Sequence, residues 1–286
     1  MWSSVAKGPD PLEMMPVSPY ARPTRWVLWL WAALILVFMY LPIAFLVLFS
    51  FNEPRTPGLP IVGLTLHWYE VAASNSILLE AVKNSIIVAA AVACIATLVG
   101  TMAAFPLVRG GIRHPDAARI IATMPIMLPG ILLGIGMLIF FRRVLDLELS
   151  ILTVIAGHLV FTTPFVVLIV AARLQGFDRR LEWAAADLGA SPRQTLRYVI
   201  LPLISPAIVA GALISVTLSI DEFIITFFTV GPQVTLPLYI YTQIKFGVTP
   251  EVNAVATVLL VSTIVLLVGA GLVLRGGRRL MNRGTR

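Results

Sequence analysis

Long apolar stretches, separated by short polar segments, dominate the pattern of residues along this chain. A helix needs roughly 20 apolar residues to cross the hydrocarbon core of a bilayer, which is about 30 Å thick. The pattern therefore predicts an all-α integral membrane protein with six transmembrane helices. The six stretches are 26–51, 85–108, 117–141, 150–174, 199–230 and 253–274.

The first apolar stretch follows two arginines, as the core of a signal peptide would. It is much longer than the roughly 7–15 residues of a signal core, so we expect it to remain as a helix. The prolines that precede it argue against a regular helix in residues 1–25, which we interpret as a tail. The rest of the chain divides into a membrane domain over residues 26–274 and a basic tail over residues 275–286.

The composition leaves little room for a water-soluble protein. Hydrophobic residues make up 58% of the 286 residues and charged residues only 12%, about half the usual share of roughly 25%. So few charged side chains cannot cover the outside of a soluble domain. The single cysteine, Cys94, excludes an intrachain disulfide framework and a zinc site built from cysteines.

The basic residues predict the orientation of the chain in the membrane. Lysine and arginine number 21 against 14 acidic residues, and we interpret them as topology markers rather than as a nucleic-acid surface. Sixteen of the 21 lie in residues 1–25, 109–119, 173–197 and 275–286. The positive-inside rule then predicts that both termini are cytoplasmic. The pair Arg142–Arg143 is the one local conflict with this orientation.

No catalytic, nucleotide-binding or metal-binding motif stands out in the sequence. None of the three lysines follows a glycine, as the lysine of a phosphate-binding loop must. The three histidines lie in different segments, and we interpret His158, inside an apolar stretch, as a polar contact between helices. We therefore expect neither an enzyme nor a cofactor. A channel, a secondary transporter and the membrane subunit of a machine with a separate ATPase remain as alternatives.

The loop over residues 176–197 carries a distinct local pattern. Its alanine-rich run with flanking charges favours a short helix, which Gly189 is well suited to end. Ser191 and Pro192 then suit the N-cap and first position of the next helix. On these residues alone, an ordinary connector and a docking element for another protein are equally supported.

This loop resembles the EAA loop of permease subunits of bacterial ATP-binding-cassette (ABC) importers, in Ala184–Ala185, Gly189 and Ile200-Leu201-Pro202. The resemblance implies a type I ABC importer permease fold in the bacterial inner membrane. It also implies a coupling helix that lies in a groove of a cytoplasmic ATPase dimer. The chain departs from the family at Trp183, where the motif glutamate is usual. The residues to which the coupling role is carried over are Glu182, Ala184, Ala185, Asp187 and Gly189.

Three further segments narrow the resemblance to spermidine/putrescine importers, and to the second of their two permease subunits. These segments are 217–223, 236–241 and 247–254. The resemblance implies a second permease subunit, a periplasmic solute-binding protein and a small cationic substrate as partners, with no nucleic acid. Importers of an iron complex or an aminophosphonate, and a self-sufficient secondary transporter, remain the alternatives.

Asp221 and Glu222 form the only acidic pair inside an apolar stretch. A carboxylate there costs roughly 2.5–3.5 kcal/mol or more, so it normally faces a cavity or a partner. On a continuous helix Glu222 would share one polar stripe with neighbouring hydroxyl residues, which favours Glu222 as the group facing a translocation pathway. Asp221 is equally suited to pair with another helix, and an aqueous interface is the plainer alternative for both. The stripe comprises Ser215, Ser219, Glu222, Thr226 and Thr229.

Tyr239 and Tyr241 complete the predicted pathway residues. Their rings can contact alkyl-ammonium groups by cation–π attraction, although anchoring at the membrane interface is the more ordinary role. Gly130 and Gly134, spaced by four residues, indicate close helix packing rather than a site.

Overall fold

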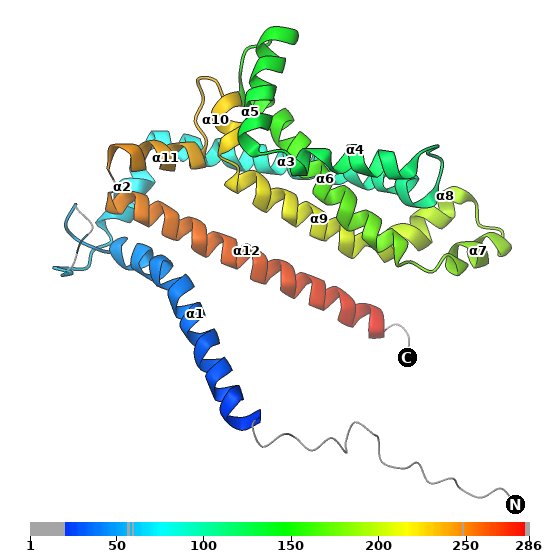
Figure 1. Ribbon diagram of the computed structural model, residues 1–286, viewed down its shortest axis with the longest axis horizontal. Helices are drawn as coiled ribbons and strands as arrows, with labels where there is room; N and C mark the ends of the chain where they lie inside the picture. The colour runs from blue at the N-terminus through cyan, green and yellow to red at the C-terminus, as the bar shows by residue number, and fades with distance from the viewer. Residues whose placement is uncertain (1–20, 56–57, 59, 248, 284–286) are drawn as a thin grey trace, which may run out of the picture.

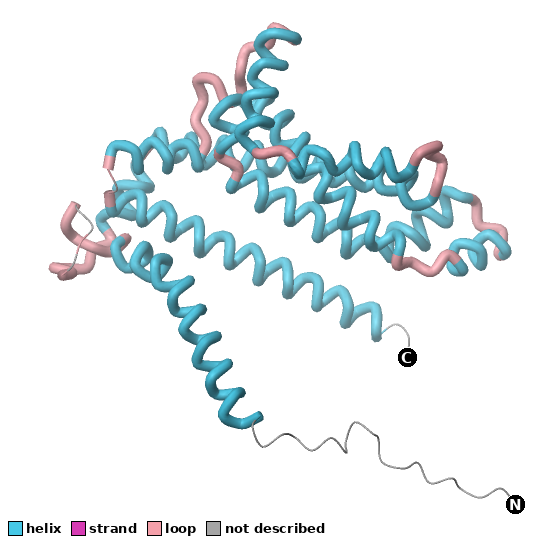
Figure 2. The backbone as a smooth tube through the Cα atoms, viewed as in Figure 1, coloured by secondary structure: helices cyan, strands magenta, loops and turns pink. Residues whose placement is uncertain are grey.

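The computed structural model describes residues 21–55, 58, 60–247 and 249–283. Over these residues the regular secondary structure is helical, as predicted, apart from one antiparallel bridge between Asn52 and Leu64, and loops join the helices (Figure 2). The helices are α1 (Ala21–Phe49), α2 (His67–Ser74), α3 (Ser76–Arg109), α4 (Pro115–Met127), α5 (Gly130–Ile139), α6 (Ile151–Gln175), α7 (Arg180–Asp187), α8 (Pro192–Thr195), α9 (Leu201–Asp221), α10 (Ile224–Thr229), α11 (Leu236–Phe246) and α12 (Pro250–Arg283). Two π-helical turns, η1 (Phe140–Val144) and η2 (Leu196–Ile200), extend α5 and precede α9.

Helices α3, α6 and α9 form the packed core of the molecule (Figure 1). Alanines on α3 meet valines on α6 and isoleucines at the start of α9, so that the three backbones approach closely. At Gly100 a Cβ atom would lie 2.7 Å from the Cβ of Val166, closer than carbon atoms can pack. Small residues therefore set the spacing of this core, as is usual between helices in membranes.

Four helical segments of the described chain are long and apolar enough to cross a bilayer. They become five if the bent pair α4–α5 counts as one span. Within α12, residues Pro250–Val265 form a shorter apolar helix. The four segments are Trp26–Phe49, Ser76–Arg109, Ile151–Gln175 and Pro192–Asp221.

The predicted transmembrane stretch over residues 117–141 is interrupted by a bend. The chain bends by 98° between α4 and the helix that follows it. The cause is Pro129, which has no N–H to continue α4 and pushes Leu128 into an extended conformation. Beyond the bend, a Cβ on Gly134 would lie 2.7 Å from the ring of Phe228. The predicted close packing is confirmed at Gly134, and its partner is α10.

The prediction of one continuous helix over residues 199–230 is wrong. Helix α9 ends at Asp221, Glu222 takes an extended conformation, and α10 packs against α5 and α6. At the other end the span begins earlier than predicted, at Pro192, and passes through the π-helical turn η2. Pro202 cannot donate to the carbonyl four residues before it, and a π turn accommodates such a missing hydrogen bond.

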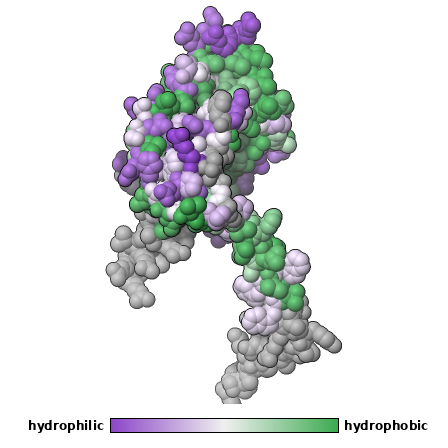
Figure 3. Space-filling model, turned by 90° about the vertical axis from the view of Figure 1, so that its left-hand side faces the viewer, coloured by the Kyte–Doolittle hydropathy of each residue, from purple (hydrophilic) through white to green (hydrophobic). Residues whose placement is uncertain are grey.

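Helix α1 stands away from the core and meets the rest of the fold near its C-terminal end (Figure 1). Every side chain over residues 26–44 is exposed, and Figure 3 shows this mostly apolar column below the main body. Such a surface needs lipid or another apolar partner to cover it.

The predicted tails are only partly described. Helix α1 begins at Ala21, five residues before the predicted start, while residues 1–20 lie outside the described part of the chain. Helix α12 continues to Arg283, through most of the predicted tail over residues 275–286.

Candidate functional site

The loop over residues 176–197 folds into a short helix and a tight turn, as predicted. It lies at the end of the core opposite α2 and α11 (Figure 1). Asp178 begins α7 by accepting a hydrogen bond from the backbone N–H of Arg180 at 2.9 Å. Ser191 and Gln194 form a reciprocal capping box at the next helix, with Pro192 in its first turn.

Gly189 ends the turn after α7 in the left-handed region, with φ of +82°. The N–H of Ala190 donates to the carbonyl of Ala185 at 3.0 Å, which closes the turn. A Cβ atom on Gly189 would meet nothing within 4 Å. The need for glycine is therefore conformational rather than steric.

The predicted coupling residues divide between two faces of α7. Ala184, Asp187 and Gly189 are exposed, whereas Glu182 and Ala185 are half-buried on the opposite side. Trp183 is 63% exposed and Leu188 89% exposed, so the outer face is largely apolar. A partner protein approaching this loop meets that face first.

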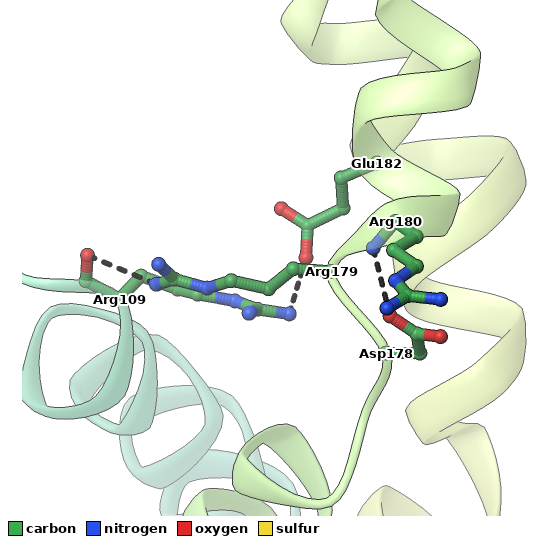
Figure 4. A network of polar contacts seen from close by, with 5 residues as sticks. All are labelled: Arg109, Asp178, Arg179, Arg180 and Glu182. Atoms are coloured by element: carbon green, nitrogen blue, oxygen red, sulfur yellow. Dashed lines mark hydrogen bonds and ion pairs between the residues drawn. The ribbon is translucent and has the colours of Figure 1, made fainter.

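Glu182 points toward the core, where its carboxylate forms an ion pair with Arg109 at the end of α3 (Figure 4). Sequence reasoning missed Arg109 as a partner of this loop. The available signal was its position directly before Gly110 and Gly111, both of which have positive φ and end the helix.

The acidic pair lies at the break between α9 and α10. Glu222 Oε1 accepts a hydrogen bond from the backbone N–H of Ile225 at 2.9 Å, so this carboxylate caps α10. Asp221 is exposed and borders a cavity of about 250 Å³ between α9, α11 and α12. The cavity is lined by Ile220, Asp221, Leu236, Pro237, Ile240, Leu259 and Thr263.

The remaining members of the predicted stripe are buried, and three of them, Ser219, Thr226 and Thr229, contact α6. The two ring nitrogens of His158 lie 2.9 Å from the hydroxyl of Ser219 and 2.8 Å from that of Thr226. His158 therefore joins α9 to α10 across their break, which confirms that it makes a polar contact between helices. Ser219 is only 4% exposed, so its hydroxyl serves this contact and does not border the Asp221 cavity.

Tyr239 and Tyr241 have different surroundings. Tyr239 is buried, and its hydroxyl donates to Glu251 Oε1 at 3.2 Å and accepts from Asn75 Nδ2 at 3.0 Å. Burial and the charge of Glu251 raise the pKa of this hydroxyl, so it remains a donor. Tyr241 is exposed, with its ring centroid 4.7 Å from that of Phe223 and 6.3 Å from that of Phe227.

Metal-binding side chains do not gather anywhere in the described residues. No three of the histidine, cysteine, aspartate and glutamate side chains found there could hold one ion together.

Comparison with known proteins gives consistent matches. Residues 96–284 match the family of binding-protein-dependent transport system inner membrane components. The chain is 40% identical over 242 residues to the spermidine/putrescine transport system permease protein PotC of Escherichia coli strain K12, covering 84% of this chain and 91% of that protein. It is 34% identical over 230 residues to the putrescine transport system permease protein PotI of the same strain, covering 78% and 82%.

The fold also matches solved structures. A bacterial ABC transporter involved in the import of the acidic polysaccharide alginate aligns with a TM-score of 0.70 at 16% identity, covering 91% of this chain and 99% of that one. The described residues thus form an all-helical ABC importer permease fold with four candidate spans, or five if the bent pair counts as one.

Replacing His158 by leucine is expected to lower stability, because Ser219 and Thr226 would lose their buried partner. The loss should be about 1–2 kcal/mol, the size typical of hydrogen bonds between membrane helices. The midpoint of thermal unfolding in detergent measures it. The triple variant H158L/S219A/T226V should recover part of the loss, because the two buried hydroxyls that lost His158 are then removed as well. A triple variant no more stable than H158L would contradict this account.

Replacing Gly189 by valine is expected to distort the turn after α7, because a β-branched residue disfavours a φ of +82°. The cost should be about 1–2 kcal/mol. The resemblance of the loop implies a separate ATPase, and the measurement is how much of this ATPase co-purifies with the variant. We expect less ATPase to be recovered with Gly189→Val. Gly189→Asn is the matched control, since asparagine tolerates the left-handed region. Equal ATPase recovery from both variants would show that this conformation is not needed.

Proposed function

The chain belongs to the family of binding-protein-dependent transport system inner membrane components, and we propose that it forms half of the translocation pathway of a spermidine/putrescine importer. It is a permease subunit of an ABC importer in the inner membrane, and ATP is hydrolysed by a separate subunit. The assignment of the transported solute rests on the similarity to the spermidine/putrescine permease, which extends over most of the chain. The family relationship argues against a secondary transporter, which works without an ATPase.

The geometry around Asp221 suits a polyamine. Its exposed carboxylate borders a cavity. The rings of Phe223 and Phe227, which follow Asp221 in the chain, contact each other and the ring of Tyr241 on α11 in tilted and edge-on arrangements. At 4 Å and an effective dielectric constant of about 20, a carboxylate–ammonium contact contributes roughly 4 kcal/mol before desolvation. Aromatic faces add about 0.5–2 kcal/mol for a cation.

The charge of Asp221 also bears on the alternative cargoes. A phosphonate group would be repelled by this carboxylate, which disfavours an aminophosphonate. The likeness to an alginate importer concerns the fold, because its 16% identity carries no information about the cargo.

Three partners follow from this assignment. A cytoplasmic ATPase dimer would bind to the exposed face of α7 and contact the apolar side chains of Trp183 and Leu188. A second permease subunit would complete the pathway, and the exposed apolar surface of α1 suits contact with that subunit or with lipid. A periplasmic solute-binding protein would deliver the cargo at the opposite face.

We further propose six spans with both termini in the cytoplasm. The sixth would be α12, whose 34 residues reach about 51 Å at 1.5 Å per residue, enough to cross a bilayer. The excess of arginine in the loops over residues 109–119 and 173–197 supports a cytoplasmic position for the coupling loop.

The proposed topology predicts the behaviour of fused reporters. A reporter that is active only in the cytoplasm should work after Arg286, and one that is active only outside should work when inserted beside Glu70. The reason is that the two positions are separated by an odd number of proposed spans. Activity of the same reporter type at both positions would contradict six spans.

Replacing Asp221 by asparagine is expected to lower polyamine uptake about tenfold, because the exposed charge at the cavity is lost while the side-chain shape is kept. Glu222→Gln is the matched variant. It removes the same charge but keeps an oxygen that can accept from Ile225, so its effect should be smaller. Uptake of radiolabelled spermidine into vesicles containing the complete complex measures both.

Assembly of the ATPase on each variant complex is the control for this experiment. Unchanged uptake by Asp221→Asn in a fully assembled complex would exclude a pathway role for Asp221. An equally large loss in both variants would mean that the charge of Glu222 matters as well as its capping bond.

A further inference from the structure

Little apolar packing holds the coupling helix α7 in place. None of its side chains from Arg180 to Asp187 is buried. Its C-terminal end continues through the Gly189 turn into α8, while its N-terminal end follows the irregular segment 176–179. Some other contact must fix α7 relative to the core if its movement is to move the core.

That contact converges on one residue, Arg109, the last residue of α3. Its guanidinium pairs with Glu182 and lies over the ring of Phe177, 5.3 Å from the ring centroid. Its carbonyl, left free by the end of the helix, accepts a hydrogen bond from Arg179 Nη2 at 3.4 Å. Figure 4 shows Glu182 and Arg179 both reaching from the loop toward Arg109.

The ion pair is shielded from solvent although it lies at the rim of the molecule. The side chains of Arg109 and Glu182 are 16% and 24% exposed. Breaking such a pair leaves a largely desolvated charge without its partner, which is far more disruptive than breaking a surface pair. The α7 end of the contact is therefore bound firmly to α3.

Helix α3 is well placed to carry a displacement onward. It packs along its length against α6 and α9. At its other end Asn75 caps the helix and donates to both Tyr239 and Glu251, and Ser85 accepts from the N–H of Leu236. A shift of α3 thus reaches the elements that border the Asp221 cavity, since Leu236 is one of its lining residues.

On the basis of the proposed function, we infer that the Arg109–Glu182 ion pair is the link that transmits movement of the ATPase from the coupling helix to α3. Glu182 is then a positioning residue that faces inward. The contact with the ATPase falls to the outer face, where exposed Trp183 stands at the position of the usual motif glutamate. Glu182, one residue before the usual position of the motif acid, and Trp183, at that position, therefore have different functions.

Charge reversal in the complete complex, reconstituted in vesicles with its second permease, ATPase and binding protein, tests this link. The variants are Arg109→Glu, Glu182→Arg and the double exchange. Two rates are measured for each: spermidine uptake and ATP hydrolysis stimulated by the binding protein. Arg113→Glu and Asp116→Arg are the matched controls, because both side chains are exposed, Arg113 in the adjoining loop and Asp116 in the first turn of α4.

Each single reversal should leave the ATPase bound and hydrolysing while spermidine imported per ATP falls at least fivefold. The double exchange should restore the ratio of spermidine imported to ATP hydrolysed to within about twofold of its value in the unaltered complex. Glu182→Gln, a milder change, should lower the ratio without lowering expression.

Three results would overturn the link: an unchanged ratio in both single reversals, loss of ATPase binding in Glu182→Gln, or a double exchange no better than the singles. The proposed cargo is tested separately. If the unaltered complex imports another solute instead of spermidine, the cargo assignment fails, and the same ratio measured with that solute still decides the link.

Discussion

The need to satisfy every backbone N–H and C=O inside a hydrocarbon solvent governs this fold. Continuous helices meet it without help, and α3 and α6 do so over 34 and 25 residues. The two interrupted spans pack against each other. Helix α5, after the bend at Pro129, lies on α10, after the break at Glu222, with Gly134 allowing the close approach.

The same constraint explains which parts of the molecule the sequence could predict. The length of each apolar stretch predicts the long helices. Local residue preferences predict α7, its end at Gly189 and the cap at Ser191. The breaks could not be found by periodicity, because a stripe such as Ser219, Glu222 and Thr226 presumes an unbroken helix. Glu222 ends that regularity through its own side chain, by bonding to Ile225.

Polar residues in the membrane also proved to have two different uses. Ser219 and Thr226 looked like a pathway lining from their spacing, yet both serve His158 on α6. Tyr239 looked like Tyr241, yet only Tyr241 is exposed. Residue type and spacing indicate which polar side chains share one side of a helix. Only the packing of segments distant in the chain decides which of them are buried and which remain exposed. Asp221 is the acid at this break that remains exposed.

Helix α3 connects these separate features mechanically. One end holds the coupling helix through Arg109, and the other end holds α11 and α12 through Asn75. Its length of 34 residues corresponds to about 51 Å, more than the hydrocarbon thickness of a bilayer. Gly100 seats its middle tightly on α6, which leaves α3 little freedom to move independently of the core. Movement imposed at the Arg109 end of α3 would therefore displace the core as a unit. The parts able to respond are those built on broken helices, where Asp221 lies.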